Sequence, residues 1–531
     1  MTKYLVITGG VISGIGKGIA AASIGRLLSP SKKVIPIKCD GYLNTDPGTM
    51  NPVEHGEVFV MDDGGEVDMD FGHYERFLNC TTKKSWNLTM GKVFDTVRLK
   101  ERRGDYLGKT VQYIPHVVNV IKDHFNRIVL EENPDLLLIE IGGTVGDMEN
   151  ELYLEAVREL KKDVGKDNIL YVHLGYVPIP SGVNEQKSKP VQQSISLLRQ
   201  RGIQPDIIIA RCKDWLTNKI RERIASWADI DTDCVITGKD TNNVYEVPVN
   251  FEKQGIVSLI NKKFSWSVIP DPSWNDLVYS MSNPSKELRV AICGKYTELE
   301  DSYASVVEAL RHSCAHFGVK PVIVWVETTN IEDGKVVVSD ALKGIDGVIV
   351  PGGFGVRGAE GKIKVINHCR NNNLPYLGLC YGMQLAVIEY ARNVCGLIDA
   401  NSTEINPSTN NPVIDLLPEQ RAISDKGGTM RLGGHDVIIN DSDSLAGKIF
   451  GDSVRLRFRH RYEVNPLYVS ELRSNGLVFS GTTPDNKIMQ IVEIKNHPFF
   501  MATQAHPELT STLTNPDKFF YNFVKACIGK K

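Results

Sequence analysis

The sequence has few cysteines, no long apolar run and no excess of basic residues. Its 531 residues include 10 cysteines, none in a CxxC pair, so a disulfide scaffold is excluded and free thiols in a reducing compartment are expected. No apolar stretch approaches the ~18 residues of a membrane span. The opening MTKYLVITGG ends at glycines, as a first β-strand does, and lacks the features of a leader peptide. We therefore expect a cytoplasmic protein without a membrane partner.

The charges are nearly balanced. Lysine and arginine number 61 and aspartate and glutamate 64, for a net charge of −3. A nucleic-acid partner is not expected, because neutralising its phosphates needs a basic excess; local sites for small phosphates remain compatible with this charge. The length predicts two to four globular domains.

Short apolar strands alternate with amphipathic helices through the first half. The run DLLLIEI is apolar on both faces, which suits a parallel strand buried between helices. The alternation predicts a doubly wound α/β domain. Its expected strands cover residues 5–8, 34–38, 136–141, 169–173, 207–210 and 234–237, and its helices include 17–28 and 190–201.

The alternation of strands and helices is interrupted at residues 267–287. This segment has three prolines and no sustained hydrophobic periodicity, which is typical of a linker. A second strand series follows, at residues 288–296, 320–326, 347–350 and 376–379. We therefore predict two α/β domains, over residues 1–266 and 288–531, joined by a linker over 267–287.

The segment PYLGLCYGMQLAVIEYA reads as a strand, a sharp turn carrying Cys380, and a helix. Gly378 and Gly382 flank the thiol by two residues on each side, the pattern of a nucleophile elbow. Farther on, AHPEL places His506 and Glu508 two positions apart, where an imidazole can accept a thiol proton while the carboxylate orients it.

An oxyanion site is expected beside this thiol. The glycine-rich VPGGFGVRG offers the Gly353 N–H, which with that of Tyr381 can bind a developing oxyanion. Each segment alone has a structural alternative, such as an inert buried cysteine or an exposed His–Glu pair.

Together, the three segments resemble the class I glutamine amidotransferases. The resemblance implies a Cys-His-Glu triad that hydrolyses the side-chain amide of glutamine and releases ammonia. It also implies that glutamine is bound by Gly353, Tyr381, Gly382, Met383, Gln384, Glu404 and Arg461.

A glycine-rich turn near the start of the chain, TGGVISGIGKGIAAASIGRLL, joins a predicted strand to a helix and can hold phosphates on its N–H groups. It departs from a regular Walker A loop at Val11 and Gly18, and so lacks the hydroxyl that binds magnesium. Carboxylates must then hold the metal, and Asp70 and Glu140 are the candidates, the latter at the end of the buried run DLLLIEI.

The whole chain resembles the CTP synthase family, because many motif segments occur along it in the same order as in that family. They include ITGGVISGIGKGIAAASIG, DPGTMNPVEHGEVFV, DFGHYERF, KERRGDYLGKTVQ, EIGGTVGDME, EQKSKPVQ, GGTMRLG, RHRYEVN and HPELTS. The resemblance implies an amidoligase domain, 1–266, that phosphorylates O4 of UTP with ATP. Ammonia from the glutaminase domain, 288–531, would then replace the phosphate.

The resemblance also implies the residues of the nucleotide and metal sites. The ATP-binding set is Gly14, Ile15, Gly16, Lys17, Gly18, Ile19, Lys38, Asp70, Lys239, Asp240 and Thr241. The set for UTP or CTP is Ser13, Asp147, Met148, Glu149, Lys187, Ser188, Lys189, Pro190, Val191, Gln192 and Arg223, and the metal ligands are Asp70 and Glu140.

Cofactors and partners follow from the same resemblance. It implies Mg²⁺, ATP as co-substrate, GTP as an activator and CTP as an inhibitor. It also implies a homotetramer built as a dimer of dimers, and filaments in many members.

Several positions depart from the family pattern, namely Gly41, Gly175, Arg223, Phe458 and Ala505. Gly41 is expected to loosen the loop beside Lys38, and Ala505 to relax the packing behind His506. None of the departures removes a catalytic group.

Two other functions stay open. One is a fused amidoligase acting on a carboxylate of a cobyrinate-like acid, against which EQKSKPVQ and GTVGDME favour a pyrimidine triphosphate. The other is a silent homologue that acts through self-assembly, which the intact triad argues against.

Overall fold

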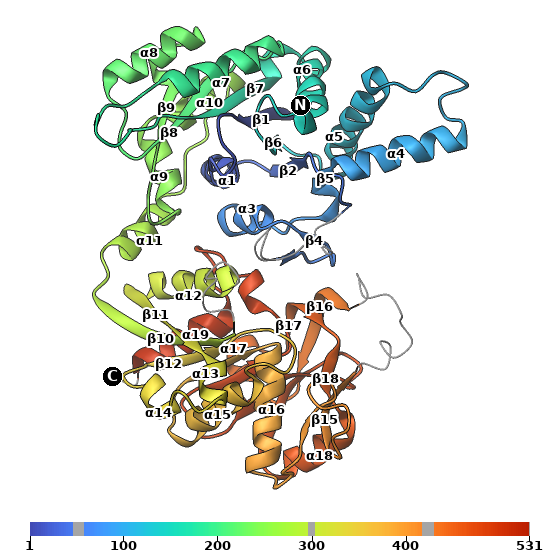
Figure 1. The fold of residues 1–531 in the computed structure, drawn as a ribbon, viewed down its shortest axis with the longest axis vertical. Helices are drawn as coiled ribbons and strands as arrows, with labels where there is room; N and C mark the ends of the chain where they lie inside the picture. Colours follow the sequence, from blue (N-terminus) through green and yellow to red (C-terminus); the bar gives the residue numbers. More distant parts are fainter. Residues whose placement is uncertain (46–57, 296–302, 417–429, 530–531) are drawn as a thin grey trace. The chain divides into compact units, whose positions relative to one another are not determined.

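The computed structural model describes residues 1–45, 58–295, 303–416 and 430–529, which form two compact units (Figure 1). One unit holds the described residues up to 45 and 73–275, and the other holds 58–72 and the residues from 276 onward. The matching segments at 46–60 and 427–433 lie partly outside the described residues.

The first unit is built on a seven-stranded parallel sheet. Its strands are apolar, as expected for a sheet that is covered by helices on both faces. Strand β6, LLLIEI, is buried at every position. The predicted doubly wound domain is confirmed. In sheet order the strands are β5 (Asn87–Thr89), β2 (Val34–Asp40), β6 (Leu136–Ile141), β1 (Lys3–Gly9), β7 (Ile169–Tyr176), β8 (Ile207–Cys212) and β9 (Val235–Lys239).

The helices of this part of the chain follow the strands. Helix α1 packs against β1, β2 and β6, and α7 against β7. The helices are α1 (Lys17–Leu28), α3 (Asp70–Leu78), α4 (Met90–Arg103), α5 (Val118–Glu132), α6 (Glu151–Val164), α7 (Lys189–Gln200), α8 (Asn218–Ala228), α9 (Glu246–Lys253), α10 (Ile256–Phe264) and α11 (Ser273–Ser282).

Helix α11 lies inside residues 267–287, which the sequence predicts to be an irregular linker. Its Trp274 is buried, packs with Phe77 and Tyr245, and donates its indole N–H to the Tyr245 carbonyl at 2.9 Å. The prolines that suggested an irregular segment therefore flank a short helix.

The second unit contains a nine-stranded mixed sheet. The predicted strands form its parallel part, and the strands beyond β21 are antiparallel. In sheet order they are β11 (Val319–Glu327), β10 (Lys286–Gly294), β12 (Gly347–Val350), β13 (Tyr376–Leu379), β21 (Phe500–Thr503), β20 (Met489–Ile494), β19 (Leu477–Thr482), β16 (Arg431–Ile439) and β17 (Ser453–His460).

Smaller sheets and helices complete this unit. The small strands are β3 (Phe59–Val60) with β4 (Glu66–Val67), and β14 (Asn401–Ser402), β15 (Pro412–Leu416) and β18 (Tyr462–Val464). The helices are α12 (Ala304–His316), α13 (Thr328–Glu332), α14 (Val338–Ala341), α15 (Ala359–Asn371), α16 (Tyr381–Asn393), α17 (Leu445–Phe450), α18 (Pro466–Ser474) and α19 (Lys518–Gly529).

The 10 cysteines form no disulfide in the structure. Within the described ranges, the helices are all too short or too polar to cross a membrane.

Candidate active sites

Cys380 stands between β13 and α16 in a strained backbone conformation, with φ 49° and ψ −100°. Its N–H donates to the Thr503 carbonyl at 2.7 Å, which ties the turn to the neighbouring strand β21. A Cβ on Gly382 would lie 2.2 Å from the Val350 carbonyl oxygen, so only glycine allows this approach. The sharp turn that the GLCYG spacing predicts is confirmed.

His506 and Glu508 follow β21, whose pairing with β13 brings them to the same end of the sheet as Cys380. The Nδ1 atom of His506 lies 2.7 Å from Oε1 of Glu508. The Cys380 thiol is also close to His506, because its charge and a side-chain interaction with it are among the causes that raise the pKa of His506. A Cβ on Gly352 would lie 2.8 Å from Cε1 of His506 and 3.7 Å from Cβ of Cys380, so this glycine packs against both side chains.

The charge state of His506 is set by opposing effects. Burial alone lowers the pKa of His506, but Glu508 and Cys380 act in the opposite direction and leave that pKa well above its usual value. At nearby His460, burial is the dominant effect and lowers the pKa to about 3. Of these two histidines, His506 is therefore the one whose surroundings favour the protonated form.

Three of the residues predicted to bind glutamine lie at the glycine-rich loop after β12, namely Gly353, Tyr381 and Glu404. The Gly355 N–H donates to Oε1 of Glu404 at 3.0 Å, and the Tyr381 hydroxyl donates to the Gly355 carbonyl at 2.6 Å. Burial raises the pKa of Glu404. A Cβ on Gly353 would be 3.7 Å from the Tyr381 ring, so these two predicted oxyanion donors are neighbours.

The other residues predicted to bind glutamine differ in how far they are buried. Met383 is fully buried in the hydrophobic core, whereas Arg461 is partly exposed between β17 and β18. Gln384 donates to the Tyr462 carbonyl at 3.0 Å and to Oε1 of Gln504 at 3.3 Å. Gln504 in turn donates to Sγ of Cys380 at 3.5 Å. No motif in the sequence pointed to Gln504, which reaches Cys380 through the turn that the chain makes before His506.

The glycine-rich loop between β1 and α1, residues 10–16, is the predicted phosphate-binding segment and is called the phosphate-type loop below. In it, Val11, Gly14 and Gly16 have positive φ values of 80°, 70° and 91°. It leads into α1, whose first residue is Lys17. The Lys17 side chain is buried, and its Nζ donates to the Gly143 carbonyl at 2.7 Å. Two predicted nucleotide segments, the loop and EIGGTVGDME, therefore meet at Lys17.

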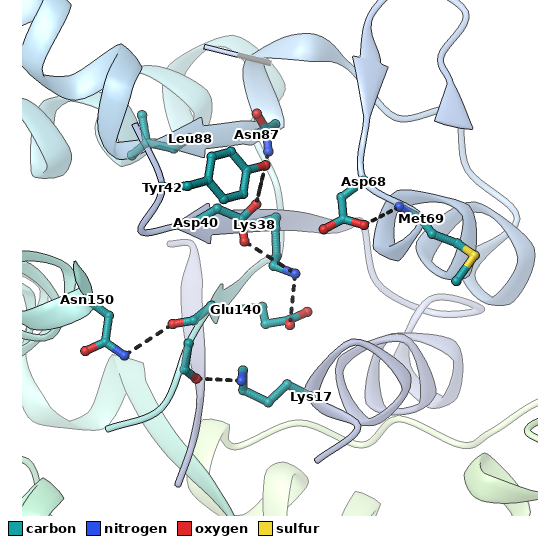
Figure 2. A network of polar contacts seen from close by, with 12 residues as sticks. Lys17, Lys38, Asp40, Tyr42, Asp68, Met69, Asn87, Leu88, Glu140 and Asn150 are labelled. Atoms are coloured by element: carbon teal, nitrogen blue, oxygen red, sulfur yellow. Dashed lines mark hydrogen bonds and ion pairs between the residues drawn. The ribbon is translucent and has the colours of Figure 1, made fainter. Parts of the chain in front are cut away.

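Lys38 lies between two buried carboxylates, as Figure 2 shows. Its Nζ is 3.6 Å from Oδ1 of Asp40 and 3.4 Å from Oε1 of Glu140. The Tyr74 hydroxyl donates to Oε2 of Glu140. Asp40 and Tyr74 were not predicted; Asp40 follows Lys38 by two strand positions and so lies on the same face.

Glu140 fits one carboxylate ligand of Mg²⁺, because it is buried at the carboxyl end of β6. The other predicted ligand, Asp70, is the first residue of α3 and is grouped with the other compact unit. Among the residues that the structure describes, no three acidic, histidine or cysteine side chains are grouped to hold a metal alone. Mg²⁺ commonly takes one or two carboxylates and completes its shell with phosphate oxygens and water.

The segment 239–241 is joined to the phosphate-type loop through Arg211. The guanidinium of Arg211 donates from Nε to Oδ1 of Asp240 at 2.9 Å and from Nη1 to the Gly14 carbonyl at 3.0 Å. Lys239 lies over the Trp215 ring, and Thr241 donates to Glu246 at 2.7 Å. Arg211 was not predicted; it is recognised only once the order of β7, β8 and β9 is known.

The segment 187–192 forms the start of α7 and the turn before it. Val191 is fully buried in a core cluster, whereas Lys187 is half-buried and pairs with Glu185 at 2.5 Å. Arg223 is exposed on α8 and helps to lower the pKa of Glu185 after the larger effect of Lys187. The other residues predicted to bind UTP or CTP are Ser13 and 147–149. Asp147 accepts a hydrogen bond from the Thr144 N–H at 2.9 Å, and Ser13, Met148 and Glu149 are exposed.

Close packing accounts for several departures from the family pattern. A Cβ on Gly41 would lie 2.7 Å from Cβ of Glu149, so the glycine there permits tight packing; the sequence suggested a loosened loop. A Cβ on Gly175 would lie 2.2 Å from Cγ2 of Val191. Ala505 and Phe458 are buried in one core cluster behind the triad.

Known proteins match over the whole chain. A family profile described as the CTP synthase N-terminus matches residues 3–266, and one described as class-I glutamine amidotransferase matches 298–526. A CTP synthase of Borreliella burgdorferi is 51% identical over 537 residues, 99% of each chain, and one of Bacillus subtilis is 46% identical over 532 residues, again 99% of each. A solved structure described as the Trypanosoma brucei CTPS glutaminase domain with bound acivicin is 37% identical and covers 46% of this chain and 95% of that chain, with a TM-score of 0.43. The chain belongs to the CTP synthase family.

Proposed function

We propose that this protein converts UTP to CTP with ATP and with nitrogen from glutamine. The observation that carries the proposal is the Cys380–His506–Glu508 arrangement, with buried Cys380 and Glu508 and with His506 2.7 Å from Glu508, in a chain similar along its whole length to CTP synthases. That similarity also argues against a cobyrinate-like substrate.

In the glutaminase step, Cys380 first transfers its proton to His506, and the thiolate then attacks the side-chain carbonyl carbon of glutamine. The N–H groups of Gly353 and Tyr381 stabilise the oxyanion. As the C–N bond breaks, His506 gives its proton to the leaving nitrogen, and ammonia and a glutamyl thioester result. Water then attacks the thioester with His506 as base, which releases glutamate and restores the thiol. Glu508 keeps the imidazole oriented throughout.

In the synthetase step, O4 of UTP attacks the γ-phosphorus of ATP, and ADP leaves. Lys17 and Lys38 neutralise charge on the transferring phosphoryl group. Ammonia then attacks C4, the C4–O bond breaks, and inorganic phosphate leaves with both electrons. Asp70 and Glu140 would hold Mg²⁺, which when bound supplies positive charge beside the phosphates.

The nucleotide assignments are part of the same proposal. The phosphate-type loop with 239–241 would bind ATP, and 147–149 with 187–192 and Arg223 would bind the pyrimidine nucleotide. Because CTP and UTP share a triphosphate, CTP should compete with UTP. Activation by GTP and assembly into a homotetramer or filaments stay predictions from the family.

Absorbance assays of UTP conversion test the proposal. Purified protein with UTP, ATP, Mg²⁺ and glutamine should give CTP, ADP, phosphate and glutamate, and omission of ATP should stop CTP formation. Lys17→Ala should remove CTP formation while glutamate release persists. A folded wild-type protein that makes no CTP from glutamine or ammonium would contradict the proposal.

A further inference from the structure

Strand β17 connects the triad to a set of alternating arginines. The Arg457 carbonyl accepts the His506 N–H at 2.8 Å, and the Arg459 carbonyl lies 3.8 Å from Sγ of Cys380. Arg455, Arg457 and Arg459 are at alternate positions, so their side chains share one face of the strand. A small shift of β17 would therefore move one carbonyl that binds the His506 main chain and another that contacts the Cys380 thiol.

The short β3–β4 hairpin, residues 59–67, binds all three arginines. Asp62 accepts from Arg455 through both carboxylate oxygens, at 2.9–3.2 Å, and Glu66 accepts from Arg459 at 2.8–2.9 Å. Between them, Nη1 of Arg457 donates to the Val60 carbonyl at 3.2 Å. The hairpin thus holds β17 at three successive positions on one face.

The main chain of the hairpin is also joined to β16. The Gly434 N–H donates to the Asp62 carbonyl at 2.8 Å, and a Cβ on Gly433 would lie 2.6 Å from the Gly64 nitrogen. Phe59 and Val60 are each 1% exposed, so the contact is shielded from water on one side. The hairpin and β17 belong to the same compact unit.

The hairpin comes from the other half of the sequence. It lies inside residues 3–266, which match the CTP synthase N-terminus, and outside residues 298–526, which match the general glutamine amidotransferase profile. The glutaminase unit of this chain is therefore completed by a segment that the amidotransferase match does not contain.

We propose that Asp62 and Glu66 are positioning residues for the glutaminase reaction, acting through the β17 carbonyls beside His506 and Cys380. The inference rests on the proposed function of the triad. The Asp62–Arg455 pair is open to solvent, and ion pairs of that kind contribute little to stability, whereas the Glu66 side chain is more shielded. A displacement of about 1 Å at a reacting group can cost about 100-fold in rate. The effect should therefore appear in the rate with glutamine far more than in the melting temperature.

The test is glutamate release and CTP formation by the full chain carrying Asp62→Asn and Glu66→Gln. These amides keep the side-chain shape and remove the charge. We expect kcat/KM for glutamine to fall by about 10- to 100-fold, while CTP formation from ammonium stays within about twofold and the pH dependence of glutamate release changes. Glu66→Gln alone, expected to give a smaller loss of the same kind, serves if the double variant folds poorly.

Asp436→Asn is the matched control. It removes the other carboxylate partner of Arg455, at 3.3 Å, and leaves the hairpin contacts in place, so glutamate release should be unchanged. A charge exchange, Asp62→Arg with Arg455→Asp, should recover part of the activity lost in Asp62→Arg. Unchanged glutamate release in the double variant, or parallel loss with glutamine and ammonium, would overturn the inference. Absence of CTP formation in the wild type with both donors would instead count against the proposed function.

Discussion

Glu508 is the residue that most directly sets the properties of the proposed base. Its Oε1 atom is 2.7 Å from Nδ1 of His506, and its charge opposes the effect of burial on the pKa of His506. Cys380 is fixed separately, by its own backbone conformation and by the bond from its N–H to Thr503. Charge and geometry at the triad can therefore be changed one at a time.

Glu508→Gln should lower the pKa of His506, because the carboxylate that raises it is lost. His506 then loses its proton at a lower pH, so the alkaline limb of glutamate release should move to lower pH. We also expect kcat to fall by about 10²- to 10⁴-fold. CTP formation from ammonium is the control and should be retained. An alkaline limb that does not move would contradict this account of His506.

The buried side chain of Lys362 should make the free energy of unfolding depend on pH. Burial, reinforced by Lys295, lowers the pKa of Lys362 to about 8, against about 10.4 in an unfolded chain. Between these values the unfolded chain binds more protons, so stability should rise with pH, and below pH 8 the native state carries the full cost of the buried charge.

Lys362→Met should therefore raise the free energy of unfolding near neutral pH by about 1–2 kcal/mol, after the loss of the cation–π contact with Tyr381. The rise in stability above pH 8 should disappear. Thermal unfolding at neutral and alkaline pH measures both effects. Lys364→Met, at an exposed position of the same helix, is the control. A lower melting temperature for Lys362→Met near neutral pH would contradict this prediction.

At the scale of elements, the contact between β7 and α7 positions the segment predicted to bind UTP. Gly175 of β7 packs against Val191 of α7 so closely that a Cβ would lie 2.2 Å from Cγ2. Val191 is fully buried, so it has no free space into which to move.

Gly175→Ala should push α7 away from the sheet and displace residues 187–192. We expect a loss of about 1–3 kcal/mol in stability and a KM for UTP raised on the order of tenfold, with glutamate release unaffected. Steady-state kinetics with varied UTP measure this. Gly529→Ala, where no atom lies within 4 Å of the new Cβ, is the control. An unchanged KM for UTP would show that α7 does not depend on this contact.

The sequence analysis predicted the strands of the first unit other than β5, and β10 to β13 of the second. It named no strand after β13, although β20 and β21 are apolar and buried. Helix α1 has the predicted bounds of 17–28, because a glycine turn ends one strand and the helix starts at Lys17. Strand β17 was missed because its arginines, which bind the hairpin, interrupt the apolar pattern. For the sites, GLCYG and HPE were recognisable from spacing, whereas Gln504, Asp40 and Arg211 become visible only when the strand order is known.

At the scale of the whole molecule, the two compact units carry different proposed chemistries. One holds the thiol, imidazole and carboxylate, and the other holds the phosphate-type loop and the Lys38–Glu140 pair. If ammonia is the sole product passed between them, the synthetase chemistry should not depend on the thiol when ammonia is supplied from solution.

CTP formation by Cys380→Ala, measured with glutamine and then with ammonium, tests this claim most directly. The account predicts at least about a 10³-fold loss with glutamine and a rate within about twofold of the wild type with ammonium. Equal loss with both nitrogen donors, or continued use of glutamine, would contradict it.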